Sequence, residues 1–128
     1  MSELSRFKIK FVFESGREIL GEFIRIKAPR TVEKLLLKLP ITSRVMLWPP
    51  ERPGEIYFNV GIKMGKEKAR KDIEPGDIAY WPMGDALCIF YEKIEPYSEV
   101  NVVGRIIGDL NELREIKRGE IVKVLKVQ

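Results

Sequence analysis

The sequence predicts a mainly β protein, a closed or nearly closed β-barrel of about eight strands with one substantial helix and a short helical turn. The apolar segments are short and recur at regular spacing, and Gly- and Pro-containing turns separate them. Two successive segments, 77–81 and 86–91, are apolar or aromatic at nearly every position. Such segments are typical of strands buried on both faces, so we expect them in the middle of the barrel.

A hairpin is predicted at the N-terminus. Residues 7–13 alternate Phe and Ile with mainly charged residues, which is the period-two pattern of a half-buried strand. Ser15-Gly16 is a turn signal, and residues 19–24 return the chain as the second arm.

The helix is predicted between Thr31 and Leu39. Thr31 stands where an N-cap residue belongs, and Glu33 lies favourably in the first turn. Pro40 ends the helix. One apolar helical face is expected from Val32, Leu35, Leu36 and Leu39.

The remaining strands follow from apolar runs bounded by Gly and Pro. A short helical turn is expected within residues 108–114. Neither a linker nor an internal repeat is visible, so residues 1–128 are interpreted as one domain. Besides the N-terminal hairpin, strands are predicted at 44–48, 55–60, 77–81, 86–91, 102–107 and 120–127.

Composition predicts a protein of the cytoplasm. The single cysteine, Cys88, cannot form an internal disulfide, and the N-terminus lacks the pattern of a secretory leader. No apolar run approaches the ~20 residues of a membrane span. The net charge is +4, but the densest basic run, 66–71, lacks interleaved aromatic residues, so no nucleic-acid partner is predicted. Frequent Lys, Glu and Ile with almost no Gln indicate a thermophilic source.

The absence of histidine narrows the possible chemistry. Ser-His and Cys-His nucleophilic mechanisms are excluded, and the commonest metal ligand is missing. Cys88 lies in an apolar segment and is expected to be a buried, inert thiol. Neither a calcium-loop pattern nor a nucleotide fingerprint is present, so no metal and no cofactor are predicted.

Aromatic residues and one arginine remain as candidates for a site. Tyr80 and Trp81 are neighbours in a strand and therefore point in opposite directions, so only one of them can face the barrel interior. The alternative interpretation is that the aromatic side chains only fill the core and the barrel ends. We predict a ligand-binding cleft, with Arg44 as its polar anchor, lined by Arg44, Trp48, Tyr57, Trp81 and Phe90.

Three segments resemble the cyclophilins. Residues 28–35 resemble the Pro-Lys-Thr turn that starts the first barrel helix, and residues 103–110 resemble a late Phe-Gly-Arg strand and its turn. Residues 76–82, together with 86–90, resemble a small prokaryotic cyclophilin-like domain family. The resemblance covers nearly the whole chain and implies a cyclophilin-like barrel.

The chain departs from the cyclophilins where their catalytic groups lie. Cyclophilins isomerise peptidyl-proline bonds with an arginine of a Phe-His-Arg motif, whereas residues 43–49 contain an arginine without that motif. Residues 86–90 replace the Ser-Gln-Phe-Phe signature of the pocket. The resemblance therefore implies a non-catalytic binding module for a peptide or small molecule. The alternatives are a residual peptidyl-prolyl isomerase with an unconventional pocket and a domain for oligomerisation, and the oligomeric state is left open.

Overall fold

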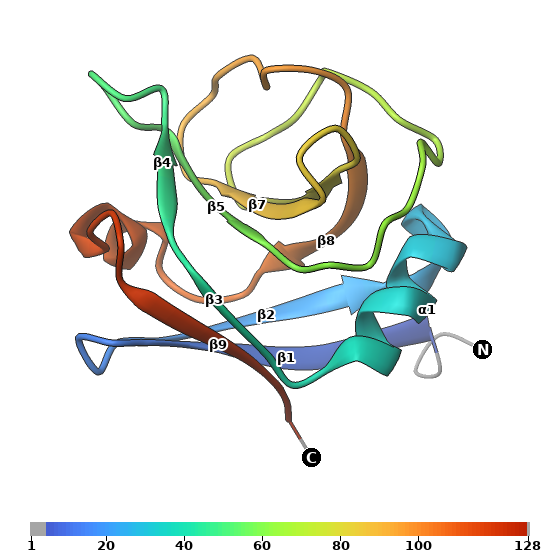
Figure 1. The fold of residues 1–128 in the computed structure, drawn as a ribbon, viewed down its shortest axis with the longest axis horizontal. Helices are drawn as coiled ribbons and strands as arrows, with labels where there is room; N and C mark the ends of the chain where they lie inside the picture. Colours follow the sequence, from blue (N-terminus) through green and yellow to red (C-terminus); the bar gives the residue numbers. More distant parts are fainter. Residues whose placement is uncertain (1–4, 128) are drawn as a thin grey trace.

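The computed structural model describes residues 5–127 and shows nine strands that form one sheet, which rolls up into a nearly closed barrel (Figure 1). One α-helix, α1 (Pro29–Lys38), and two 3-10 helices, η2 (Arg25–Lys27) and η3 (Leu110–Glu115), accompany it. The strands are β1 (Arg6–Phe13), β2 (Glu18–Ile24), β3 (Ile41–Arg44), β4 (Met46–Trp48), β5 (Glu55–Asn59), β6 (Asp77–Trp81), β7 (Ala86–Phe90), β8 (Asn101–Ile106) and β9 (Ile121–Lys126).

The sheet is closed by a continuous segment of chain. Its strand order is β3-β9-β1-β2-β8-β6-β7-β5-β4, so the strands at its two ends, β3 and β4, are separated in sequence only by Val45. The Val45 amide still donates to the Glu120 carbonyl at 2.9 Å, after which the chain leaves β9 and pairs with β5. The strand predicted at 44–48 is therefore β4 together with the last residue of a separate strand, β3, whose first three residues were not predicted as a strand, and this additional strand gives the barrel nine strands among the described residues.

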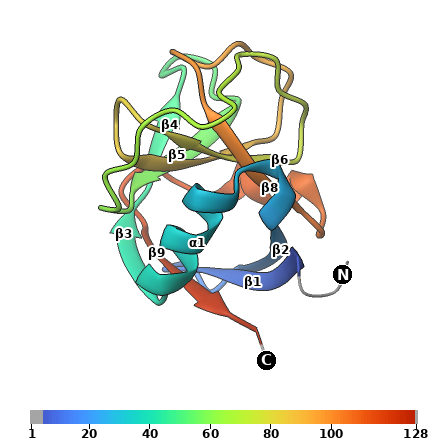
Figure 2. The same ribbon diagram turned by 90° about the vertical axis from the view of Figure 1, so that its right-hand side faces the viewer.

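Helix α1 covers one end of the barrel (Figure 2). The prediction of Thr31 as N-cap was wrong, because Pro29 begins the helix and Thr31 lies buried in the first turn. The free amides of Arg30 and Thr31 instead donate to the Glu67 carboxylate at 2.9 and 2.8 Å, and the Thr31 hydroxyl donates to it at 2.7 Å. Burial acts to raise the pKa of Glu67, but these hydrogen bonds lower it overall.

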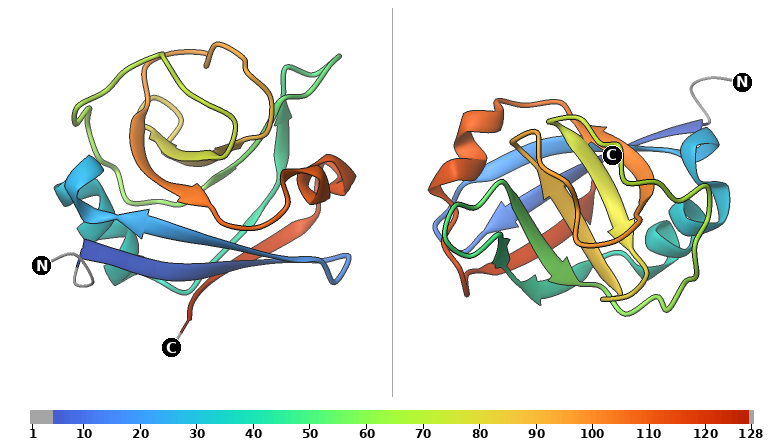
Figure 3. Two further views of the ribbon diagram at one scale, coloured as in Figure 1. Left: turned by 180° about the vertical axis from the view of Figure 1, so that it is seen from behind. Right: turned by 90° about the horizontal axis from the view of Figure 1, so that it is seen from above.

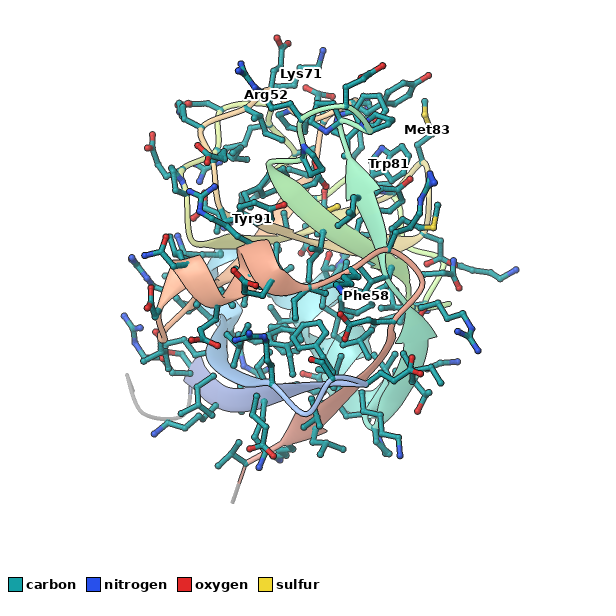
Figure 4. The ribbon with its side chains drawn as sticks, turned by 90° about the vertical axis from the view of Figure 1, so that its left-hand side faces the viewer. Arg52, Phe58, Lys71, Trp81, Met83 and Tyr91 are labelled. Carbon is teal, nitrogen blue, oxygen red and sulfur yellow. The ribbon has the colours of Figure 1, made fainter. Side chains whose placement is uncertain are left out.

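The layer formed by β5, β7 and β6 separates two clusters of buried side chains. The larger cluster fills the barrel interior and includes Phe58 and Tyr80. The smaller one lies on the outer face, where Trp81 packs beside Cys88 and Phe90. Tyr80 and Trp81 thus point in opposite directions, as their adjacency predicted, and Figure 4 shows Phe58 and Trp81 on opposite sides of this layer. Both faces of β7 are buried, as predicted for the middle of a barrel.

Two long loops, 60–76 and 91–100, arch over the outer face of this layer (Figure 3). Arg70 and Val100 join them through two backbone hydrogen bonds of 2.9 Å. Lys93 adds a side-chain hydrogen bond of 2.5 Å to the Ile73 carbonyl. The loops therefore support each other and cover the smaller cluster. None of the helices within residues 5–127 is long and apolar enough to cross a membrane.

Candidate functional site

A pocket of about 120 Å³ opens on the outer face of the β5–β7–β6 layer. It is lined by Trp48, Glu55, Tyr57, Trp81, Cys88 and Tyr97. Four of these six side chains are aromatic, and one is a carboxylic acid. We call this set of residues the aromatic pocket.

Five of the six residues lie on strands, and the alternation of side chains along each strand and the pairing between strands place them on the same face of the sheet. Glu55 and Tyr57 are two residues apart on β5, so their side chains share one face of the sheet. Trp48 of β4 pairs with Glu55, and Cys88 of β7 pairs with Tyr57. Directly paired residues also share a face, which places Trp48 and Cys88 beside the two β5 side chains. Trp81 extends the same face from the end of β6.

The four aromatic rings contact one another edge to face. The ring of Tyr97 lies 5.7 Å from that of Trp48 and 5.7 Å from that of Trp81, at interplanar angles of 86° and 70°. Trp81 in turn lies 5.8 Å from Tyr57 at 88°. Rings that meet nearly at right angles form walls with different orientations, so the pocket presents both ring faces and ring edges to its contents.

Trp81 is held in place from two sides. Its indole Nε1–H donates a hydrogen bond of 2.6 Å to the Ser98 hydroxyl in the loop 91–100. On the other side, Gly84 lies against the ring, and a Cβ atom there would come within 2.3 Å of two ring carbons. Only a residue without a side chain therefore leaves room for Trp81 in this position.

Glu55 is the only acidic residue in the lining, and it is 4% exposed. Burial raises the pKa of this carboxyl group to about 7, and a hydrogen bond with the Cys88 thiol offsets part of that rise. None of the ion pairs within residues 5–127 includes Glu55. Glu55 can therefore be either neutral or charged near neutral pH.

Cys88 is not activated for nucleophilic chemistry. Burial raises the pKa of its thiol well above the ordinary value, and the nearby Glu55 carboxylate raises it further. Its side chain is 2% exposed, as expected for an inert buried thiol. Within the described part of the chain, no three Cys, Asp or Glu side chains lie close enough together to hold a metal ion.

Three of the five residues predicted for the cleft line the aromatic pocket: Trp48, Tyr57 and Trp81. Phe90 is fully buried in the smaller cluster beneath them. Arg44 lies on β3, which pairs with β9, and its guanidinium donates a 2.9 Å hydrogen bond to the Gly119 carbonyl. The structure thus places Arg44 outside the lining of the pocket and Phe90 behind it.

Sequence reasoning missed Glu55, Cys88 and Tyr97. Glu55 had a usable signal, because it lies two residues before Tyr57 in a predicted strand and must share its face. Cys88 could be placed only with the register of β5 against β7, which the sequence does not show. Tyr97 lies in a loop without periodicity, so nothing in the sequence connected it to the other rings.

Comparison with solved structures supports this architecture. A hypothetical protein from Archaeoglobus fulgidus is 34% identical in sequence, and the match covers 96% of each chain with a TM-score of 0.77. McbB, solved in complex with tryptophan, is 16% identical and has a TM-score of 0.75 over 91% of this chain and 44% of its own. At that identity, McbB shares the fold.

The curated proteins contain no match to the chain. The sequence profile of the Cyclophilin-like family, however, matches residues 7–125, which is nearly the whole length. This match agrees with the barrel, with the Archaeoglobus structure and with the resemblance seen in the sequence. The chain belongs to the Cyclophilin-like family.

Proposed function

We propose that this protein is a binding module that holds a small molecule, or one side chain of a peptide, in the aromatic pocket. The observation that carries the proposal is the convergence of four aromatic side chains around an open volume of about 120 Å³. A cavity of about 150 Å³ in another protein binds benzene, so this pocket suits a group of similar size. Larger ligands would extend past Met83 and Tyr97, which are exposed at its edge.

The fold is compatible with such a role. McbB has a similar barrel and is described in complex with tryptophan, which is a small molecule. Binding sites commonly combine apolar and aromatic walls with a few polar groups that orient the ligand. Glu55 is a polar group of this kind in the present pocket.

The isomerase alternative has weaker support, because its essential donor is missing from the pocket. Cyclophilin-type isomerisation needs an arginine near the prolyl nitrogen, and the pocket lining contains none. The guanidinium of Arg44 is instead hydrogen-bonded to the Gly119 carbonyl. We therefore favour binding without isomerisation.

The test uses the two tryptophans of the chain, since both line the pocket. Labelled protein is titrated with small neutral aromatic and aliphatic fragments, and the indole N–H signals of Trp48 and Trp81 are followed by NMR. Fragments that bind are expected to shift both signals together. Fragments that shift only amides remote from the pocket would contradict the proposal, and so would a library in which nothing binds.

A pair of glycine substitutions provides matched variants. Gly84→Ala places a methyl group where the Trp81 ring lies, so the ring must move and fragment affinity is expected to fall by about tenfold or more. Gly65→Ala introduces the same methyl group where no atom lies within 4 Å, and affinity should be unchanged. Equal effects of the two substitutions would show that the position of Trp81 does not matter for binding.

A further inference from the structure

The aromatic pocket combines two features that attract positive charge. The face of an aromatic ring carries negative electrostatic potential, and Trp is the strongest of the natural side chains in this respect. Two Trp and two Tyr rings surround the pocket, and a carboxyl group lies among them. Lys and Arg are absent from the lining residues, so the lining contains no formal positive charge that would oppose the ring faces and the carboxyl group.

Glu55 is costly to bury as an anion. A carboxylate removed from water needs a cation or several hydrogen-bond donors in compensation. Glu55 is 4% exposed and belongs to none of the ion pairs of residues 5–127, so no side-chain cation of the described chain compensates its charged form. A cationic ligand in the pocket would therefore be stabilised both by the rings and by the carboxylate.

We propose that the aromatic pocket binds an organic ammonium cation, with the ring faces of Trp48, Tyr57, Trp81 and Tyr97 around the cation and the Glu55 carboxylate as its counter-ion. This inference rests on the proposed binding function and names the ligand class. A methylated ammonium group suits the pocket because it is weakly hydrated and has the size of a small apolar group. The rest of the ligand would extend past Tyr97, which is 62% exposed.

Such binding depends on the ionisation of Glu55. Among the described residues, Cys88 and Tyr91 interact electrostatically with Glu55, and Tyr57 and Tyr97 line the same pocket. Burial raises the pKa of Cys88 and of Tyr91 above their ordinary values, so neither group changes charge between pH 6 and pH 8. Because burial raises the pKa of Glu55 to about 7, a ligand of fixed positive charge should bind more tightly as pH rises from 6 to 8.

The experiment compares choline with its neutral carbon isostere, 3,3-dimethylbutan-1-ol, by calorimetry and by tryptophan fluorescence. The two probes have the same shape and differ in charge. At pH 8, choline is expected to bind about tenfold more tightly than the isostere, and this preference should shrink at pH 6. Equal affinities would overturn the cation inference while leaving the pocket as a binding site. Binding of neither probe would also overturn it, whereas the fragment titration decides the proposed function separately.

Two variants separate the contributions of charge and ring. Glu55→Gln keeps the size of the side chain and removes its charge, so the preference for choline should shrink and its pH dependence should disappear while the isostere still binds. Tyr97→Leu replaces an exposed lining ring by an apolar side chain without a π face, and it is expected to weaken choline binding about three- to tenfold and to weaken binding of the isostere less. Unchanged choline affinity in both variants would overturn the inference.

Two sources could supply the ammonium group: a free small molecule or a trimethyl-lysine side chain of a peptide. Choline, free trimethyl-lysine and a short peptide containing trimethyl-lysine are therefore compared. Tighter binding of the peptide than of the free amino acid identifies a peptide ligand. Equal affinities identify a free small molecule, and weaker binding of all three than of the neutral isostere would overturn the inference.

Discussion

The two faces of the β5–β7–β6 layer are built from alternating residues of the same strands, yet they differ in kind. The inner face contributes Phe58 and Tyr80 to the large cluster that fills the barrel. The outer face contributes Tyr57 and Trp81 to a smaller cluster that borders an open pocket. Neighbouring residues in one strand therefore serve the stability of the barrel and the shape of the pocket separately.

This difference indicates how a small barrel can carry a surface pocket without weakening its core. The buried carboxyl group of Glu55 lies on the outer face of the layer. The backbone of the layer separates it from the apolar side chains of the interior, so its burial does not disturb their packing. The loops 60–76 and 91–100 cover part of that face, and the pocket lies between Tyr97 of the second loop and Trp48 of β4. Substitutions on the two faces should accordingly give different phenotypes.

The largest expected effect is on the inner face. Phe58→Ala removes a fully buried ring that contacts Phe11 edge to face at 6.3 Å, and it should lower the free energy of unfolding by about 3–5 kcal/mol. Tyr57→Ala, one residue earlier on the partly exposed outer face, should cost about 1 kcal/mol. Urea denaturation of both variants measures the difference, and similar losses would show that the two faces contribute equally to stability.

A second prediction concerns the cost of Glu55. The pKa of this group is raised from 4.5 to about 7 in the folded state, so between these values the folded protein holds a proton that the unfolded chain has lost. Stability should therefore fall as pH rises through that window, by about 2–3 kcal/mol between pH 5 and pH 8. The measurement is the difference in unfolding free energy between the wild-type protein and Glu55→Gln at each pH.

Glu55→Gln lacks this titration and is therefore the control for the wild-type protein. All other titratable groups contribute equally to the pH dependence of stability in both proteins. The variant is expected to gain stability relative to the wild type as pH rises. A constant difference between the two proteins from pH 5 to pH 8 would mean that the carboxyl group titrates normally and that its burial carries little cost.

The smallest effect is expected at Arg44. Its guanidinium donates to the Gly119 carbonyl on the β3–β9 side of the barrel, so Arg44→Ala should change stability by about 1 kcal/mol or less. Choline affinity, measured by calorimetry, should stay within about twofold of the wild type, because Arg44 does not line the pocket. A loss of about tenfold or more would instead support Arg44 as the polar anchor expected from the sequence.

Sequence reasoning predicted most of the fold because the strands carry their own signals. The apolar character of 77–81 and 86–91 identified the central pair, and the alternation at 7–13 identified the first hairpin. The division of 44–48 could not be predicted, because it depends on which strands lie on either side of Val45. Thr31 was misread as an N-cap, since the capping carboxylate of Glu67 comes from a distant loop.

The site was harder to predict than the fold. Trp48, Tyr57 and Trp81 could be singled out because the chain has more large aromatic residues than a small core needs, and because Trp and Tyr carry polar groups that need a partner. The assembly of the pocket depends on cross-strand register, which sets Trp48 beside Glu55 and Cys88 beside Tyr57. It also depends on a loop that brings Tyr97 against Trp48, and loop conformation leaves no periodic trace in the sequence.

The position of Tyr97 in a loop also bears on how the shape of the aromatic pocket could diversify during evolution. Five of the six lining residues lie on strands, whereas the sixth, Tyr97, belongs to the loop 91–100 and is exposed. Loops tolerate substitution and changes of length far better than the strands of a barrel do. A few mutations around Tyr97 could therefore reshape the pocket in related proteins while the barrel and its buried acid were inherited unchanged.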